Sequence, residues 1–425
     1  MSVDRRTFLR ATVTGGTVLL SAAMGTGFAQ GGERRRRVYV VVLDGLRPDE
    51  VSPTLTPNLT ALKAAGTWFG NARSLPIMET IPNHVMMMSG VRPDRSGVPA
   101  NAVYDRDKRV IRDLDRASDL RGSTMLDRVR ERGLRSGTVL SKEYLYGIFG
   151  ERATYRWEPG PIVPISGHAP DAFTADAAIA MIDEADPDLL FCNLGDCDRV
   201  GHADLTGTTL ALARTAAVRT SDDRLGAIVS HLKDTGRWQH SVLFVLADHS
   251  MDWSVAWQLV SLQPVVDADP MLAGNVVIAQ NGGADLLYWT GPIRDREAAT
   301  RRMLDVVTDV PGVLSAHRPG QLGLGREAGD VVVYCEAGWR FSDPKPWSNP
   351  IPGNHGHPAT EPIPFLISGG DPVIRGGHAS SAQAYTIDVA PTVGALFGLS
   401  EPSGGYDGEV RAEAFTRAPV ATDIA

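Results

Sequence analysis

Acidic and histidine side chains follow three apolar segments of the chain and occupy one glycine-containing loop. These side chains belong to Asp44, Asp198, His202, Asp248, His249 and His355. Taken singly, each has an ordinary structural explanation, such as a helix cap or a salt bridge between residues four positions apart. Together, carboxylates and imidazoles at successive strand ends predict binding of divalent metal, with zinc favoured over manganese or iron. Two such ions about 4 Å apart can hold a phosphoryl group during in-line displacement.

A threonine stands at the start of an apolar segment, LPIMETIPNHVMMMSG, which covers residues 75–90. The run Met86–Met88 predicts a buried helix, and Thr80 lies between two prolines where that helix would begin. A polar residue at this position can cap the helix. Alternatively, it can act on a ligand, because the helix N-terminus favours negative charge. The residues alone leave both roles open for Thr80.

Strand-like and helix-like segments alternate along the chain, so the fold class can be predicted. Apolar strands are predicted at 38–43, 136–141, 188–196 and 241–250, and helices at 56–66, 123–133, 171–187, 208–236 and 384–399. This alternation predicts an α/β, doubly wound, largely parallel sheet with helices on both faces. In such a sheet, polar residues at the strand ends form the site. The irregular stretch 252–347 predicts a smaller subdomain inserted into one domain that covers 38–425.

Composition excludes some classes of partner. The 425-residue chain has a formal net charge of −8 and a pI near 5.7. This acidity argues against specific binding of nucleic acid and against an anionic membrane. Three cysteines, Cys192, Cys197 and Cys335, are too few and too scattered for a disulfide framework or a four-cysteine zinc site. A single Cys192–Cys197 bridge stays open.

The first 29 residues have the plan of an export signal. Arg5–Arg6 precede Phe8–Leu9 and an apolar run over 11–23, and a cleavage position follows Ala29. The paired arginines resemble the twin-arginine signal. A short membrane anchor is the alternative, but the run is too short and glycine-rich to span a bilayer well. We therefore expect a periplasmic or extracellular protein without stable membrane insertion after signal removal, and a basic linker over 30–37.

Five ordered segments resemble the alkaline phosphatase superfamily. They are VVLDG, ETIPNH, DRVGH, ADHSM and GNHGH. They are similar to the motifs of the type I phosphodiesterase/nucleotide pyrophosphatase branch, which contain D-G, T-x-P-N-H, D-x-x-G-H, D-H-G-M and H-G in this order. The resemblance covers residues 38–400. One departure is Ser250, which stands where the family has glycine and changes no expected ligand.

The resemblance implies roles for single residues. One metal ion would be bound by Asp198, His202 and His355. A second would be bound by the residues Asp44, Asp248, His249 and Thr80. Thr80 would attack phosphorus and form a phosphothreonine, and Asn101 would donate to a phosphoryl oxygen. His84 is expected to be structural.

The resemblance implies a small-molecule phosphoester substrate, and we expect hydrolysis of phosphodiesters or pyrophosphates. Ile81 stands where many diesterases have an aromatic residue, which weakens the expectation of a stacked base. Lys142 resembles in position a lysine of phosphonoacetate hydrolases and threonine-dependent monoesterases, although Tyr144 replaces their second basic residue. Lys142 is therefore either a substrate contact or a surface charge. A phosphomonoesterase or phosphonoacetate hydrolase is the alternative function.

Three other classes fit less well. A C-x-P-x-R element of sulfatases is absent from the sequence. A catalytically silent relative would have lost its nucleophile or ligands, and all are present here. Phosphoglycerate mutase-like enzymes use a serine and act in the cytoplasm. The predicted export signal therefore argues against this class. The oligomeric state stays open.

Overall fold

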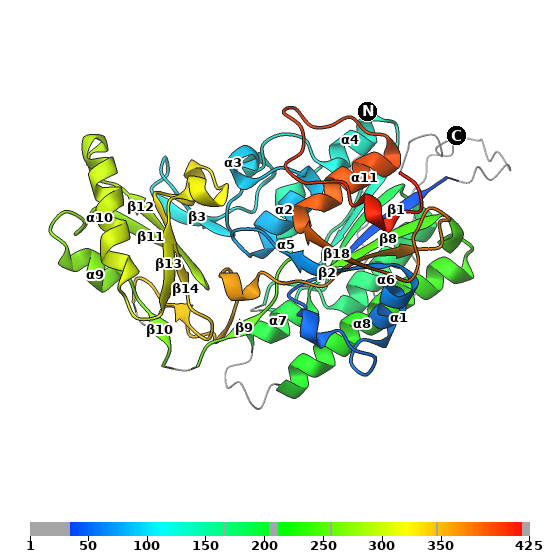
Figure 1. The fold of residues 1–425 in the computed structure, drawn as a ribbon, viewed down its shortest axis with the longest axis horizontal. Coiled ribbons are helices and arrows are strands. Elements are labelled where there is room, and N and C mark those ends of the chain that lie inside the picture. The colour runs from blue at the N-terminus through cyan, green and yellow to red at the C-terminus, as the bar shows by residue number, and fades with distance from the viewer. Residues whose placement is uncertain (1–34, 165, 204–210, 256, 346, 419–425) are drawn as a thin grey trace, which may run out of the picture.

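A mixed sheet of eight strands forms the centre of the molecule (Figure 1). The computed structural model describes residues 35–418 except 165, 204–210, 256 and 346. Across the sheet the strands are β18 (His378–Tyr385), β2 (Thr67–Arg73), β17 (Phe365–Gly369), β8 (Ser241–Leu246), β1 (Arg37–Leu43), β7 (Leu189–Leu194), β5 (Ser136–Leu140) and β6 (Tyr155–Trp157).

The middle of the sheet is parallel and apolar. β1 lies between β7 and β8 and runs parallel to both, with Val40 opposite Phe191 on one side and Phe244 on the other. The residues of β7 and β8 are all buried, as expected for parallel strands that are covered on both faces. Only β17 runs antiparallel to its neighbours, β8 and β2. The prediction of a largely parallel α/β sheet is therefore confirmed.

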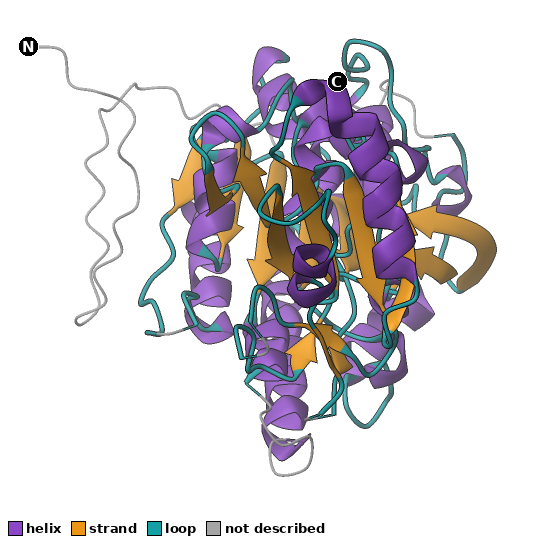
Figure 2. Cartoon of the chain, turned by 90° about the vertical axis from the view of Figure 1, so that its left-hand side faces the viewer, coloured by secondary structure: helices purple, strands orange, loops and turns teal. Residues whose placement is uncertain are grey.

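Helices cover both faces of the sheet, which the two views of the chain show (Figures 1 and 2). One face carries α1 (Pro57–Ala65), α6 (Asp171–Glu184) and α8 (Ala211–Asp234), and the short helix α7 (Asp196–His202) packs against α8. The other face carries α2 (Thr80–Ser89), α4 (Met125–Glu131), α5 (Glu143–Phe149) and α11 (Val389–Phe397). The short helix α3 (Pro93–Ser96) follows α2 and packs against it.

Helix α2 is buried along its whole length. Met86, Met87 and Met88 have no exposed surface, as the apolar run predicted. Gly90 ends the helix with a φ of 73°, in the left-handed region that glycine adopts without a steric penalty. Thr80 is the first helical residue. Because α2 packs against α4, α5 and α11, its N-terminus is held in a fixed position.

The segment predicted as an insertion forms a second, antiparallel sheet with its own apolar core. Its strands follow the order β11 (Val276–Asn281), β12 (Ala284–Trp289), β14 (Val331–Cys335) and β13 (Val313–His317). The helices α9 (Gln263–Ala268) and α10 (Arg296–Thr308) pack together beside it, to the left in Figure 1. A short pair, β9 (Asp252–Trp253) with β16 (Gly353–Asn354), joins the start of this part to the segment that follows it. A second short pair, β10 (Leu259–Val260) with β15 (Arg340–Phe341), lies within the inserted part.

A β-hairpin that follows α3 contacts this second sheet. Its strands are β3 (Ala102–Asp105) and β4 (Val110–Asp113). The backbone N–H of Ala102 donates to Oδ1 of Asn281 in β11 at 2.9 Å, and Nδ2 of Asn281 donates back to the Ala102 carbonyl at 3.0 Å. The inserted part is therefore hydrogen-bonded to the residue that follows Asn101.

The end of the predicted basic linker is part of the folded domain, so that prediction is corrected here. Arg36 is buried, with Nε 2.9 Å from Oδ2 of Asp371, and Arg37 begins β1. Nη2 of Arg37 lies 2.5 Å from Oδ2 of Asp186. These arginines are ion-paired to the domain instead of being solvated. The predicted export signal over 1–29 lies outside the described residues.

The three cysteines are buried and free, so the open question of a Cys192–Cys197 bridge is answered against it. Sγ of Cys197 lies 3.2 Å from Oγ of Ser221. No helix within the described ranges is long and apolar enough to cross a membrane.

The inserted part contains a buried carboxyl group next to a second one. Asp285 is fully buried in β12, and among the described residues no N–H or O–H group donates a hydrogen bond to its oxygens, while Asp343 lies beside it. Asp343 accepts hydrogen bonds from the hydroxyl of Ser261 and from the backbone N–H groups of Leu262 and Gln263. Burial, together with the neighbouring Asp343, raises the pKa of Asp285 well above its usual range. Asp285 is thus neutral in the folded protein at neutral pH.

This carboxyl group should make the protein less stable as the pH rises. At neutral pH Asp285 is protonated in the folded protein and ionised in the unfolded chain. The free energy of unfolding therefore decreases as the pH rises from about 4, the pKa of Asp285 in the unfolded chain, to its raised pKa in the folded protein. We expect Asp285→Asn, which cannot ionise, to flatten this dependence and to raise the free energy of unfolding at pH 8 by at least about 1 kcal/mol. Chemical denaturation at pH 5 and at pH 8 measures the free energy of unfolding of both proteins, with Asp267→Asn, at an exposed position, as the control. An equal effect of Asp285→Asn at both pH values would contradict the assignment.

Candidate active site

Three parallel strands bring their acidic residues to one edge of the sheet. Asp44 follows β1, Asp248 follows β8 by two residues, and Asp198 lies in α7, which begins after β7. In the register of these strands, Leu43 pairs with Leu194, and Val42 pairs with Leu246. The carboxyl ends therefore lie side by side, where ligands bind in open α/β sheets.

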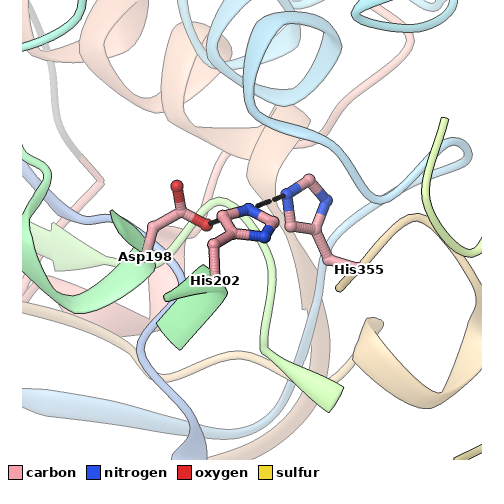
Figure 3. Close-up of side chains that lie close together, drawn as sticks. All are labelled: Asp198, His202 and His355. Carbon is pink, nitrogen blue, oxygen red and sulfur yellow. Dashed lines mark hydrogen bonds and ion pairs between the residues drawn. The ribbon is translucent and has the colours of Figure 1, made fainter. Parts of the chain in front are cut away.

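One predicted set of ligands comes together around Asp198. Oδ1 of Asp198 lies 3.2 Å from Nε2 of His202, one helical turn later, and 3.7 Å from Nε2 of His355. The two imidazole Nε2 atoms lie 3.2 Å apart (Figure 3). Because His355 follows β16, this group joins α7 to a loop far along the chain.

The second predicted set comes together around His249. Nε2 of His249 lies 3.1 Å from Oγ1 of Thr80, 3.4 Å from Oδ2 of Asp248 and 3.8 Å from Oδ1 of Asp44. The rings of His249 and His355 stack with their centroids 3.7 Å apart, so the two sets are adjacent. One donor atom of Asp198 also lies within 4.8 Å of donor atoms of Asp44 and His249, so Asp198 is adjacent to both sets.

All three histidines of these sets have the same orientation. Each approaches a backbone carbonyl with Nδ1: His202 that of Gly353 at 2.7 Å, His249 that of Ser250 at 2.9 Å, and His355 that of Met78 at 3.1 Å. A carbonyl can only accept, so each Nδ1 carries a proton, and in the neutral imidazole Nε2 is then the nitrogen that presents a lone pair to the centre. This hydrogen bond is the usual way in which a protein orients a metal-binding imidazole.

The centre of the site is rich in acceptors and poor in donors. Oδ1 of Asp44, Oδ1 of Asp198 and Oδ2 of Asp248 are buried and receive no hydrogen bond from the described residues. Burial and the neighbouring Asp248 raise the pKa of Asp44. Buried charges of one sign require a compensating cation. These oxygens and the Nε2 lone pairs fit the donor set of zinc, manganese or iron.

Lys142 is the protein's own cation in the site, so its interpretation as a surface charge is wrong. It has no exposed surface, and Nζ lies 2.8 Å from Oδ2 of both Asp44 and Asp198 and 3.4 Å from Oγ1 of Thr80. Burial alone would lower the pKa of Lys142, but Asp198 and Asp44 outweigh burial and raise it. Lys142 therefore stays protonated beside the candidate nucleophile.

Thr80 and Asn101 are held by backbone contacts. Oδ1 of Asn101 accepts a hydrogen bond from the N–H of Ile81 at 2.8 Å, which leaves the Nδ2 group of Asn101 as the donor. The N–H of Asn101 donates to Glu79 at 2.7 Å, and burial raises the pKa of Glu79 to about 8. Thr80 thus lies at a helix N-terminus with a side-chain amide beside it, a combination that suits an anionic ligand.

Sequence reasoning missed a polar network behind the candidate metal ligands. Nδ2 of Asn193 donates to Oδ2 of Asp44 at 2.8 Å and to Nε2 of His84 at 3.0 Å, while the hydroxyl of Ser141 donates to Oδ1 of Asn193 at 2.6 Å. Nδ1 of His84 donates to the Thr80 carbonyl at 2.8 Å. Both nitrogens of His84 are therefore in use, although it lies near Asp44 and Asp248. The available signal was Asn193 itself, an amide inside an apolar strand.

The comparison with family models decides the family. The model described as type I phosphodiesterase/nucleotide pyrophosphatase matches residues 38–358. The chain belongs to this family. It is thereby a member of the alkaline phosphatase superfamily, as the five ordered segments indicated.

Curated relatives and solved structures agree with this assignment. Ectonucleotide pyrophosphatase/phosphodiesterase family member 1 of Mus musculus is 23% identical over 226 residues, which are 49% of this chain and 23% of the relative. Venom phosphodiesterase of Naja atra is 25% identical over 228 residues, 49% of this chain and 25% of the relative. The chain thus matches about a quarter of the length of these family members.

Two solved structures share the fold. Murine ectonucleotide pyrophosphatase/phosphodiesterase 5, as an inactive threonine-to-alanine variant in complex with AMP, superposes with a TM-score of 0.70 at 18% identity. The match covers 86% of this chain and 96% of that one. The human protein gives a TM-score of 0.71 at 16% identity, over 90% and 100% of the chains. At 18% and 16% sequence identity, these two superpositions show that the chain has the same fold as the two proteins.

Proposed function

We propose that this family member is an exported, metal-dependent hydrolase of phosphodiester or pyrophosphate bonds, with Thr80 as its nucleophile. The observation that carries the proposal is the position of Oγ1 of Thr80, 3.1 Å from Nε2 of His249 and 3.4 Å from Nζ of Lys142. The nucleophile therefore lies among cation ligands at a helix N-terminus. The murine neighbour, inactive when a threonine is replaced by alanine, supports a threonine nucleophile.

Seven side chains would hold two divalent ions, for which zinc is the best candidate: Asp198, His202 and His355 for one, and Asp44, Asp248, His249 and Thr80 for the other. When bound, the ions supply positive charge that favours an ionised threonine hydroxyl and stabilises charge on phosphoryl oxygens.

The chain's own groups perform the remaining steps. Oγ1 of Thr80 bonds to phosphorus as the ester or anhydride oxygen leaves, and the resulting phosphothreonine is then hydrolysed by water. Nδ2 of Asn101 and the ammonium of Lys142 are placed to donate to phosphoryl oxygens, where they stabilise the charge of the transition state. Ile81 is buried and offers no stacking surface, so a nucleotide base would have to be bound elsewhere.

The metal dependence can be tested directly. We expect chelation to abolish hydrolysis of bis-p-nitrophenyl phosphate and zinc to restore it. His202→Ala should lower the bound metal by about one ion per chain, because it removes one of only three ligands of its group. Elemental analysis and kcat/KM on the same samples measure both effects, with His231→Ala on α8 as the matched control. Full turnover after complete metal removal would contradict the proposal.

A second function keeps support from one observation, the burial of Lys142 beside Thr80. A fixed cation at this place would also suit a phosphomonoester or phosphonoacetate. The kcat/KM values for bis-p-nitrophenyl phosphate, p-nitrophenyl phosphate and phosphonoacetate distinguish the functions. We expect the diester to be the best substrate, and a clear preference for either of the others would favour the alternative.

A further inference from the structure

A second cation lies next to Lys142 and has no role in the steps described above. Arg199 follows Asp198 in α7, and its Nε approaches the same Asp198 oxygen as Lys142 does, at 3.9 Å instead of 2.8 Å. That distance is too long for a hydrogen bond. Nε of Arg199 is buried and has no hydrogen-bond partner in the part of the chain that the structure describes. A buried donor without a partner costs free energy, so its retention here requires a reason.

A tyrosine connects the two cations. Tyr144 lies in the first turn of α5. The centroid of its ring is 5.8 Å from Nζ of Lys142 and 5.5 Å from the guanidinium carbon of Arg199. Nη2 of Arg199 donates to the Tyr144 hydroxyl at 3.1 Å. Since Lys142 is fully buried and the Arg199 side chain is 20% exposed, the series Thr80, Lys142, Tyr144 and Arg199 leads outward from the nucleophile.

Two like charges in one place repel each other unless an anion joins them. The carboxylates of Asp44 and Asp198 hold Lys142 at hydrogen-bond distance, whereas the nearest carboxylate recorded for Arg199 is Asp198 at 3.9 Å. A guanidinium presents its donors in a planar fork that matches the oxygens of a phosphoryl group. Asp198 therefore satisfies Lys142 but not Nε of Arg199, and the partly exposed guanidinium keeps a donor that a phosphoryl oxygen arriving from the solvent side can accept.

We propose that Arg199, positioned by Tyr144, forms a subsite for a second anionic oxygen group of the substrate, next to the phosphorus that Thr80 attacks. The inference rests on the proposed function of that site. It assigns a preference for substrates with an additional negative charge beside the scissile bond. The charge belongs either to the second phosphate of a pyrophosphate or to the extra ionised oxygen of a monoester. Arg199 thus determines specificity, and Lys142 with Asn101 contacts the reacting phosphoryl group.

The test compares substrates that differ in charge. For zinc-loaded protein, kcat/KM is measured with bis-p-nitrophenyl phosphate, p-nitrophenyl phosphate and ATP, the last followed by AMP release. Arg199→Gln should lower kcat/KM for at least one of the two more highly charged substrates by about 10- to 100-fold more than for the diester. Arg199→Lys should recover part of this difference, and the exposed Arg294→Gln is the matched control. A selective loss with p-nitrophenyl phosphate identifies the monoester oxygen, and one with ATP identifies the second phosphate.

Binding gives a readout that does not depend on turnover. In a Thr80→Ala background, Arg199→Gln should weaken the calorimetric affinity for orthophosphate by about tenfold while the zinc content stays the same. If Arg199→Gln lowers kcat/KM equally for all three substrates, or leaves unchanged the ratio of kcat/KM for the more highly charged substrates to that for the diester, the proposed subsite is wrong. If Thr80→Ala retains turnover, the proposed function fails. If Thr80→Ala is inactive and the substrate ratio is unchanged, only the subsite fails.

Discussion

Thr80→Ala should lower kcat for bis-p-nitrophenyl phosphate by at least about a thousandfold, because it removes the proposed nucleophilic oxygen. Metal content should stay nearly the same, since Asp44, Asp248 and His249 remain around the empty position. The buried methyl group of alanine fits in the space of threonine, so the fold should persist. Steady-state kinetics and elemental analysis on the same preparation measure both quantities.

Thr80→Ser is the matched control for this change. It keeps the hydroxyl group 3.1 Å from His249 and removes only a methyl group, so a large part of the activity should remain. Near-normal turnover by Thr80→Ala with intact metal content would rule out a covalent role for Thr80. A loss of metal in step with activity would instead make Thr80 chiefly a ligand.

The second large effect is expected for Lys142→Met. Nζ of Lys142 lies 2.8 Å from a carboxylate oxygen of Asp44 and 2.8 Å from one of Asp198. The variant removes this positive charge and leaves the two buried carboxylates without it. We expect the metal-free protein to lose about 3–5 kcal/mol of stability. We also expect kcat to fall by about a hundredfold in zinc-loaded protein, because the donor 3.4 Å from Thr80 is lost.

Comparison of metal-free and zinc-loaded protein separates these two contributions. Zinc compensates the carboxylates, so the stability difference between Lys142→Met and wild type should shrink on loading, while the kinetic defect stays. Lys233→Met, at an exposed position of α8, is the control. Unchanged kinetics in Lys142→Met would show that this lysine is structural and would remove the basis of the monoester alternative.

Much of the candidate site could be predicted from the sequence because several of its candidate metal ligands follow strands. Val38–Leu43, Leu189–Leu194 and Ser241–Leu246 are apolar enough to be recognised as buried strands, and in a parallel sheet their carboxyl ends meet. Asp198 and His202 are four residues apart, so a single helix brings them together. His355 had to be placed by its resemblance to a motif, because no local pattern connects a loop after β16 to α7.

The environment of the buried polar groups could not be predicted. A lysine at the end of a strand is usually solvated, and only the tertiary structure shows that Lys142 is enclosed with Asp44 and Asp198. Arg36 is a similar case, because its partner Asp371 is 335 positions away. The network of Asn193 also depends on contacts between segments that are distant in sequence. Such pairings leave no periodic pattern that a sequence could display.

The most direct test is to trap the covalent intermediate. Zinc-loaded protein is mixed with bis-p-nitrophenyl phosphate, quenched in acid during the first turnovers and analysed by peptide mass spectrometry, with Thr80→Ala in parallel. A nitrophenyl phosphoryl adduct on Thr80, formed at the rate at which the first nitrophenol is released and absent from Thr80→Ala, is the predicted result. Turnover of wild-type protein without any adduct at Thr80, or with the adduct on another residue, would contradict the role assigned to this threonine.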